Sequence, residues 1–90
     1  MRVVVVVMSG VPLSIGYRAL GNILSSKEGA QGFVLRTKSL SKALEYSNKL
    51  GVDYVVILGE REYKENAVTI KNMRTGEQFK VSLEEVGRNI

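Results

Sequence analysis

The chain has 90 residues, which suits one domain spanning residues 1–90 and leaves no room for a second core. It contains no Cys and no His, which excludes thiol nucleophiles, disulfides, imidazole or thiolate metal sites and His-based acid–base catalysis. The net charge is +4, with seven basic and two acidic side chains in residues 1–50, so the first half favours a polyanionic partner, although an ordinary solvated surface explains it equally well.

The first elements alternate between apolar runs and helical spacing. Residues 2–8 are mostly valine, and β-branched side chains on both faces predict a central strand of a parallel sheet. After the break at 9–12, apolar residues recur at helical spacing from Leu13 to Leu24, although Gly16 and Gly21 weaken this helix. Residues 33–35 predict a short second strand.

The middle of the chain predicts a second helix and a third strand. Ser39 suits the N-cap of a helix, and Gly51 stands where a left-handed residue would end it. The apolar residues 54–58 predict a strand covered on both faces, which we place at the centre of the sheet. The link 59–65 is expected to be a loop or a single helical turn.

The last third predicts a hairpin and a final helix. Residues 67–73 and 78–81 alternate in polarity and are joined through 74–77, as in an antiparallel pair. Ser82 followed by Glu85 is a capping box that predicts a helix through Val86. The order and the right-handed crossover rule predict an α/β fold: a three-layer α/β/α sandwich of three helices around a five-stranded, mostly parallel mixed sheet.

Polar residues follow each of the three parallel strands, and the carboxyl ends of such strands are where open α/β sheets bind ligands. Arg36, Thr37 and Lys38 end the second strand and suit phosphate and base-edge contacts, or else form a solvated turn. Glu60 and Glu62 follow the third strand, where hydrogen bonding to a base amino group is favoured over catalysis and a solvated loop is favoured over both. The loop Ser9 to Ser14 lacks the glycine and lysine spacing of known phosphate-binding loops.

Two strings within residues 33–86 carry a resemblance to a known family: SNKLGVDYVVILGE at 47–60 and NMRTGEQ at 72–78. They resemble the C-terminal anticodon-binding domain of class II aminoacyl-tRNA synthetases, and the histidyl type most of all. The resemblance implies a five-stranded mixed sheet between helical layers. It also implies that the chain binds the anticodon loop of tRNA, needs no cofactor and has no catalysis of its own.

The same resemblance implies an RNA-binding set on three segments: the turn before the second helix, the segment after the Gly-Glu pair, and the next strand. Those places hold Arg36, Thr37 and Lys38, then Glu62, then Lys71. Thr37 and Glu62 would hydrogen-bond base edges, while the three cations would contact phosphates. All of them are expected at or beside the carboxyl edge of the sheet.

The catalytic domain of a synthetase is absent, so the chain is either a fragment of a histidine–tRNA ligase or a free-standing relative. The expected partners are tRNA and either a synthetase catalytic domain or a second copy in a homodimer. The alternative function is a protein-interaction or regulatory subunit that no longer binds tRNA, and a small-ligand sensor is a more distant one. The lack of Cys fits the cytoplasm, and no apolar run approaches the roughly 18 residues that span a bilayer.

Overall fold

A computed structural model describes all of residues 1–90 and contains one five-stranded sheet with the order β2-β1-β3-β4-β5. The strands are β1 (Arg2–Met8), β2 (Gln31–Thr37), β3 (Tyr54–Leu58), β4 (Ala67–Asn72) and β5 (Gln78–Ser82). The helices are α1 (Leu13–Ser26), α2 (Leu40–Leu50), α3 (Glu60–Lys64) and a 3-10 helix, η1 (Leu83–Asn89). None of the helices has both the length and the apolar character needed to cross a membrane.

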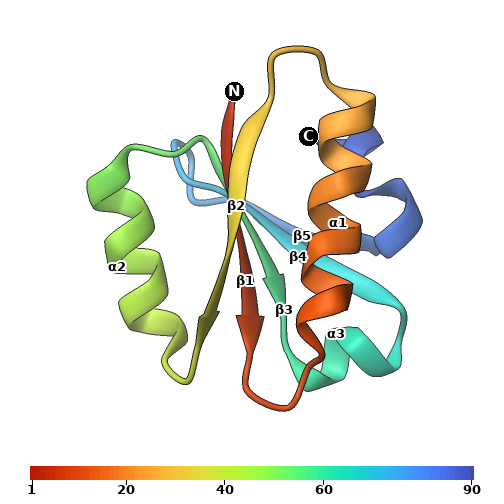
Figure 1. Cartoon of the computed structure of the whole chain (residues 1–90). Helices are drawn as coiled ribbons and strands as arrows, with labels where there is room; N and C mark the ends of the chain where they lie inside the picture. Colours follow the sequence, from red (N-terminus) through yellow and green to blue (C-terminus); the bar gives the residue numbers. More distant parts are fainter.

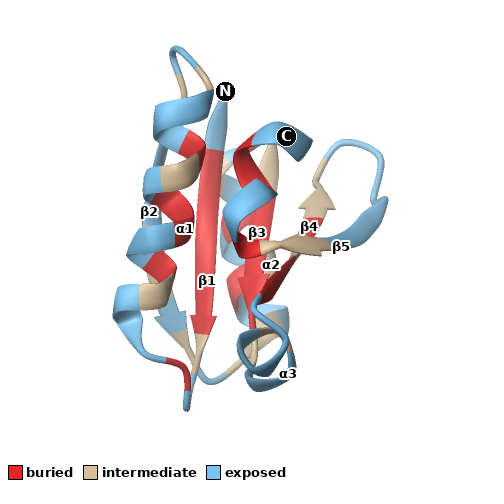
Figure 2. Ribbon diagram, turned by 90° about the vertical axis from the view of Figure 1, so that its right-hand side faces the viewer, coloured by how far each residue is buried: buried red, intermediate tan, exposed pale blue.

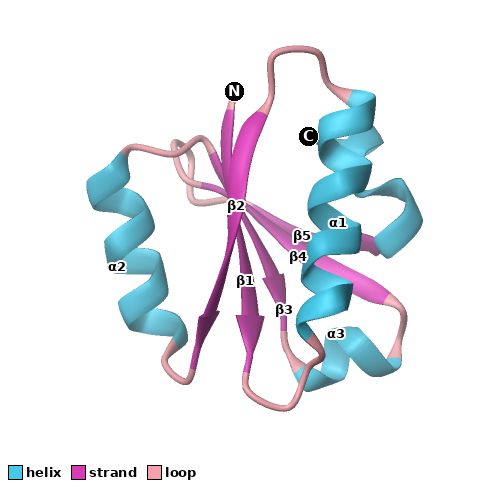
Figure 3. Ribbon diagram, viewed as in Figure 1, coloured by secondary structure: helices cyan, strands magenta, loops and turns pink.

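The three-layer α/β/α fold is confirmed. Helix α2 covers one face of the sheet, and α1 and η1 cover the other (Figures 1 and 3). The expectation of a mostly parallel sheet is wrong in detail: β1 runs parallel to both β2 and β3, whereas β3–β4 and β4–β5 are antiparallel. The reason is that the short α3 crosses only the end of the sheet, so β4 must return alongside β3 in the opposite direction.

The valines of β1 are buried and hold the layers together. In Figure 2 this strand is coloured as buried along most of its length. Alternate side chains point to opposite faces of a strand. Val3, Val5 and Val7 therefore join the core beneath α1, and Val4 and Val6 join the smaller core beneath α2. All five are at most 1% exposed. The prediction that apolar side chains on both faces of this strand are covered is confirmed.

The ends of α2 match the sequence-based prediction. The Ser39 hydroxyl accepts a hydrogen bond from the Lys42 N–H at 3.3 Å, so Ser39 is the N-cap. Gly51 closes the helix with φ of 71°, the left-handed conformation that glycine adopts without steric cost. These two residues fix where the chain leaves β2 and where it enters β3.

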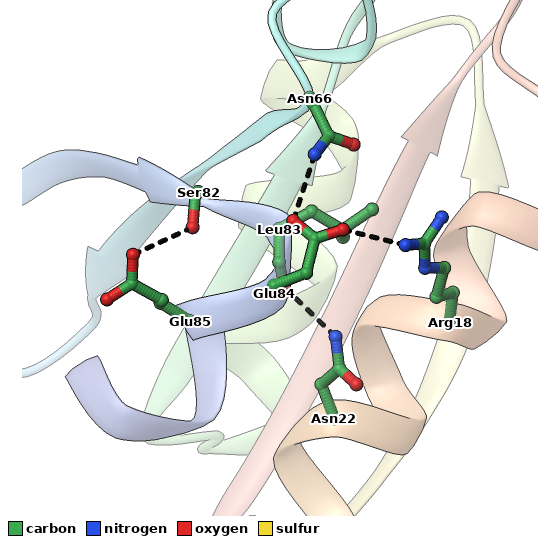
Figure 4. Close-up of polar contacts among 7 residues, drawn as sticks. All are labelled: Arg18, Asn22, Asn66, Ser82, Leu83, Glu84 and Glu85. Atoms are coloured by element: carbon green, nitrogen blue, oxygen red, sulfur yellow. Dashed lines mark hydrogen bonds and ion pairs between the residues drawn. The ribbon is translucent and has the colours of Figure 1, made fainter.

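The final element differs from the prediction. Residues 83–89 form a 3-10 helix rather than an α-helix. The capping box is not made, because the Ser82 hydroxyl bonds the Glu85 carboxylate at 3.1 Å instead of a backbone N–H. Side-chain contacts hold η1 to its neighbours (Figure 4): Glu84 pairs with Arg18 at 2.7 Å, and Asn22 donates to the Leu83 carbonyl.

Helix α1 lies unusually close to the sheet at Gly16. A Cβ at Gly16 would collide with Cγ2 of Val7 and lie 3.0 Å from Cγ1 of Val34. A Cβ at Gly21 would meet nothing within 4 Å. The first glycine therefore permits the close packing of α1 on β1 and β2, whereas the second has no packing role.

Asp53 ties the amino ends of the strands together. Its carboxylate accepts the Arg2 N–H at 2.8 Å and pairs with the Arg74 guanidinium at 3.3 Å. Its backbone N–H donates to the Arg2 carbonyl, and its carbonyl accepts the Met73 N–H. The hydrogen bond from Arg2, followed by the charge of Arg74, holds the pKa of Asp53 below its ordinary value of 3.8 despite partial desolvation.

The two glycines of α1 give a matched pair of substitutions. We expect Gly21→Ala to raise the free energy of unfolding by about 1 kcal/mol, because alanine favours the helix and meets open space. We expect Gly16→Ala to lower it by about 1–3 kcal/mol, since the added methyl group overpacks against Val7. Urea unfolding measures both; stabilisation by both substitutions would contradict the packing of α1.

The Asp53→Asn variant tests the amino-end junction through its pH dependence. The folded chain lowers the pKa of Asp53, so the ionised carboxylate stabilises the fold above pH 3.8 and this stabilisation is lost as the pH falls through the folded pKa. The melting temperature of the variant should be lower at neutral pH, and the difference should vanish in strong acid. Glu28→Gln, at an exposed residue without a polar partner, is the control and should show no such convergence.

Candidate nucleic-acid interface

The carboxyl ends of β1, β2 and β3 meet at one edge of the sheet, here called the carboxyl edge. Met8 lies opposite Thr37, and Val7 lies opposite both Arg36 and Leu58. The loops that follow the three strands therefore lie side by side, as the parallel arrangement predicts. Arg36, Thr37, Lys38 and Glu62 all lie at or just beyond this edge.

The Arg36 guanidinium is partly committed to the fold. It donates a hydrogen bond to the backbone carbonyl of Val11, in the loop between β1 and α1. The end of β2 is thereby tied to the start of α1. A guanidinium has five N–H donors, so Arg36 retains donors for an anion while its position is fixed by the loop.

The Thr37 hydroxyl is also used locally. Oγ1 accepts the Ser39 N–H at 3.0 Å and donates to the Ser39 carbonyl at 3.1 Å. This closed turn presents Lys38, which is exposed and makes no hydrogen bond or ion pair. Thr37 therefore positions the turn, and Lys38 is its free cation.

A shallow groove of about 290 Å³ runs between β2 and α2, here called the β2–α2 groove. Apolar side chains line much of it, together with two cations; the lining residues are Leu35, Arg36, Thr37, Lys42, Ala43 and Tyr46. The sequence did not indicate this groove, because it forms only where α2 packs against β2. Helical spacing of four residues between Lys42 and Tyr46 was the available signal.

Glu62 holds the segment after β3 in place. One carboxylate oxygen accepts the Gly59 N–H at 3.0 Å, and the other accepts the Thr69 hydroxyl at 3.0 Å. Its neighbour Glu60 lies against Gly10 of the first loop, where a Cβ would come within 2.7 Å of Glu60 Oε1. Both oxygens of Glu62 thus have partners within the chain, a commitment that the sequence does not reveal.

The prediction that Lys71 lies at or beside the carboxyl edge is wrong. Lys71 pairs with Val55, near the amino end of β3, whereas Arg36 lies level with Leu58. Three residues along the strands and three strand spacings separate Lys71 from Arg36, or roughly 17 Å. The cause is the direction of β4, which is antiparallel and carries its later residues away from that edge.

Lys71 instead belongs to an uncovered face of β4 and β5. Val68 and Ile70 pack beneath α1, so the alternate residues point to the side of α2. Helix α2 contacts β1 and β2 and does not extend over β4 and β5 (Figure 1). The side chains on this open face are polar, and they are named here the open polar face: Thr69, Lys71, Gln78 and Lys80.

The charges on the open polar face are only partly compensated. Lys80 pairs with Glu65 at 2.5 Å, and this hydrogen bond lowers the pKa of Glu65. Lys71 has no acidic partner within ion-pair distance. The face therefore carries an unpaired cation next to uncharged hydrogen-bonding groups, a combination that suits a phosphate backbone and unpaired bases.

The largest cavity lies elsewhere, at the amino ends of the strands. It measures about 450 Å³ and is lined by Met1, Asp53, Tyr54, Asn72, Arg74 and Ile90. The Asp53 carboxylate and the Asn72 side chain already accept hydrogen bonds there. No group of three or more acidic side chains in the chain is arranged to hold a metal ion. The polar surfaces at the carboxyl edge and on β4 and β5 are therefore the stronger candidates for a functional site.

A family model and two similar proteins point to the same protein family. A family model described as an anticodon binding domain matches residues 2–90. The chain is 46% identical over 67 residues to a histidine–tRNA ligase of Aquifex aeolicus, covering 74% of this chain and 17% of that protein. It is 44% identical over 52 residues to a histidine–tRNA ligase of Pyrococcus horikoshii, covering 58% of this chain and 12% of that protein. The chain thus spans less than a fifth of the length of these relatives.

Solved structures show the same fold. The histidyl-tRNA synthetase of Nostoc superposes with a TM-score of 0.74 at 24% identity, over 97% of this chain and 21% of that one. The RNA binding domain of threonyl-tRNA synthetase from Cryptosporidium parvum superposes with a TM-score of 0.79 at 15% identity, over 99% of this chain and 22% of that one. At these identities the structural likeness concerns the fold alone.

Proposed function

Since the chain belongs to the family of anticodon binding domains, we propose that it is a tRNA-binding module of the histidyl type that binds the anticodon loop and performs no catalysis itself. The observation that carries this proposal is the open polar face, where Lys71 stands without an acidic partner on a part of the sheet that α2 does not cover. A polar sheet face with a free cation suits unstacked RNA bases, which need a flat and polar surface.

Phosphate contacts would come from the carboxyl edge as well as from the open polar face. Lys38 is a free cation on the turn after β2, and Lys71 is a free cation on β4. A flexible single-stranded loop can contact both at once, because its backbone is not held in a helix. Arg36 would add a further contact, although its guanidinium also bonds Val11.

Base contacts would come from the ordered turns between these cations. Thr37 and Glu62 have hydroxyl and carboxylate oxygens that retain lone pairs beyond the bonds they make in the fold. Both residues are held rigidly by those bonds, which favours discrimination between bases. Tyr63, 42% exposed, lies next to Glu62 and offers a ring on which a base can stack.

The relatives named above are ligases, and the chain corresponds to a small part of each. We propose that aminoacylation, where this chain takes part in it, depends on a synthetase catalytic domain, and that the module acts in the cytoplasm. The alternative is a protein-interaction or regulatory subunit. The observation that favours this alternative is that Arg36 and Thr37 already make hydrogen bonds within the chain. Those bonds leave fewer of their polar groups available to RNA.

Phosphate binding is tested by the double variant Lys38→Ala/Lys71→Ala. We expect weaker tRNA binding and a smaller salt dependence, with the slope of log K against log salt reduced by about 0.7 for each lost contact to a single strand. The control is Lys27→Ala/Arg88→Ala, which removes the same charge from the residue that follows α1 and from η1. Equal losses in the two variants would mean that net charge, not the proposed surface, governs binding.

Base recognition is tested by Thr37→Val and Glu62→Gln with two tRNAs, one carrying a histidine anticodon and one with that loop scrambled. We expect each variant to reduce the preference for the histidine anticodon while leaving the salt slope nearly unchanged, since base contacts specify and phosphate contacts anchor. Melting temperatures separate this effect from a loosened turn.

Two results with the unmutated chain would reject this mechanism. Equal affinity for both tRNAs would exclude recognition of the anticodon. Absence of binding to either tRNA at low salt would favour the protein-interaction alternative, because electrostatic attraction to RNA is strongest under that condition.

A further inference from the structure

The unpaired positive charge of the first half of the chain gathers mainly at one place. Of the seven basic side chains in residues 1–50, Arg18 of α1 and Lys49 of α2 are in ion pairs. Arg2 and Lys27 lie toward the amino ends of β1 and β2. The remaining three have no acidic partner within ion-pair distance and lie where β2 ends and α2 begins: Arg36, Lys38 and Lys42.

These three cations border the β2–α2 groove. Arg36 and Lys42 line it, and Lys38 stands on the turn between β2 and α2. No acidic side chain lines the groove. Glu45, the one acidic residue of α2, pairs with Lys49 at 3.5 Å and so adds little negative charge there. The groove therefore attracts an anion.

The groove also offers an aromatic ring to a ligand. Tyr46 follows Lys42 by about one helical turn, and it is 47% exposed. Leu35 and Ala43, which belong to the core beneath α2, supply an apolar surface next to the ring. Proteins bind single-stranded nucleic acids through this combination, because bases stack on aromatic rings while cations follow the phosphates.

The size of the groove suits one nucleotide rather than a longer segment. Its volume of about 290 Å³ lies at the lower end of the roughly 300–1,000 Å³ that small-molecule sites occupy. A docked peptide helix needs apolar pockets for its residues i, i+3, i+4 and i+7. The apolar part of this groove consists only of Leu35, Ala43 and the Tyr46 ring, which is too little for a helix and enough for one base.

The groove is continuous with the carboxyl edge but separate from the open polar face. Thr37 lies at the carboxyl edge and also lines the groove. Helix α2 packs on β1 and β2, so it stands between the groove and the open polar face of β4 and β5 (Figure 1). An RNA loop whose anticodon bases lie at the carboxyl edge and the open polar face therefore reaches the groove with a nucleotide next to the anticodon.

We propose that the β2–α2 groove binds one unstacked nucleotide of the anticodon loop, outside the anticodon itself, with its base on the Tyr46 ring and its phosphate at Lys42. This inference rests on the proposed function, since it requires that the chain binds an anticodon loop. Stacking accepts any base, because every base has an aromatic face. The groove therefore senses that a base is present at this position and does not read which base it is.

The inference is tested with anticodon stem–loop RNAs of the histidine type in which one loop nucleotide at a time lacks its base. For the unmutated chain, one RNA that is abasic outside the anticodon should bind about fivefold or more weakly, as loss of a stacked base does. Exchange of that base for another should have little effect. In Tyr46→Ala the penalty for the missing base should disappear, and in Tyr46→Phe, which keeps the ring, it should remain.

The cation of the groove is tested separately. Lys42→Ala should reduce the slope of log K against log salt by about 0.7, the value for one contact to a single strand. The matched control is Tyr17→Ala/Lys27→Ala, which removes an exposed tyrosine from α1 and a lysine from the residue that follows it. The control should keep the penalty for the missing base, and melting temperatures verify that every variant is folded.

The possible failures are distinguishable. If the unmutated chain prefers the histidine anticodon but every abasic penalty is the same in Tyr46→Ala, the groove inference is overturned and the proposed function stands. If no stem–loop binds at low salt, both are rejected. Amide NMR shifts at Ala43 and Tyr46 that a polyglutamate peptide produces and the stem–loop does not would assign the groove to an acidic protein segment, and they would equally overturn the inference.

Discussion

The register of β1 between β2 and β3 is the constraint on which the remainder of the structure depends. Because β1 is parallel to both neighbours, Val7 brings the ends of β2 and β3 to the same level. Burial of its valines on both faces requires a layer on each side, and α1 and α2 supply them. The carboxyl edge is therefore a consequence of how one apolar strand is buried, and the contact of Arg36 with the Val11 carbonyl joins two of its loops.

The short α3 sets the second half of the molecule apart from the first. A long crossover helix after β3 would have placed another parallel strand and covered one face of the sheet beside it. Five residues of helix only turn the chain, so β4 and β5 return antiparallel and remain bare on the side of α2. The open polar face exists because this connection is too short to cover it, and its alternating sequence, apolar toward α1 and polar away from it, fits that exposure.

The sequence predicted the elements well where local chemistry decides them, as at the Ser39 cap, the Gly51 terminus and the valine strand. It did not predict positions and hydrogen bonds that depend on residues distant in the sequence. The position of Lys71 along the sheet follows from the direction of β4, which no local pattern indicates. The carboxylate of Glu62 and the guanidinium of Arg36 bond backbone groups that only folding brings near. Likewise, Glu85 drew the Ser82 hydroxyl away from the backbone, and a 3-10 helix formed.

The two edges of the sheet differ in the side chains that they present. Toward β5 the sheet ends in polar side chains with Lys80 on its last strand, which favours nucleic acid and opposes strand pairing. Toward β2 it ends in a seven-residue strand that carries Arg36 and is bordered by exposed apolar side chains, among them Phe33 and Tyr46. The open polar face lies at the opposite end of the sheet from these apolar side chains.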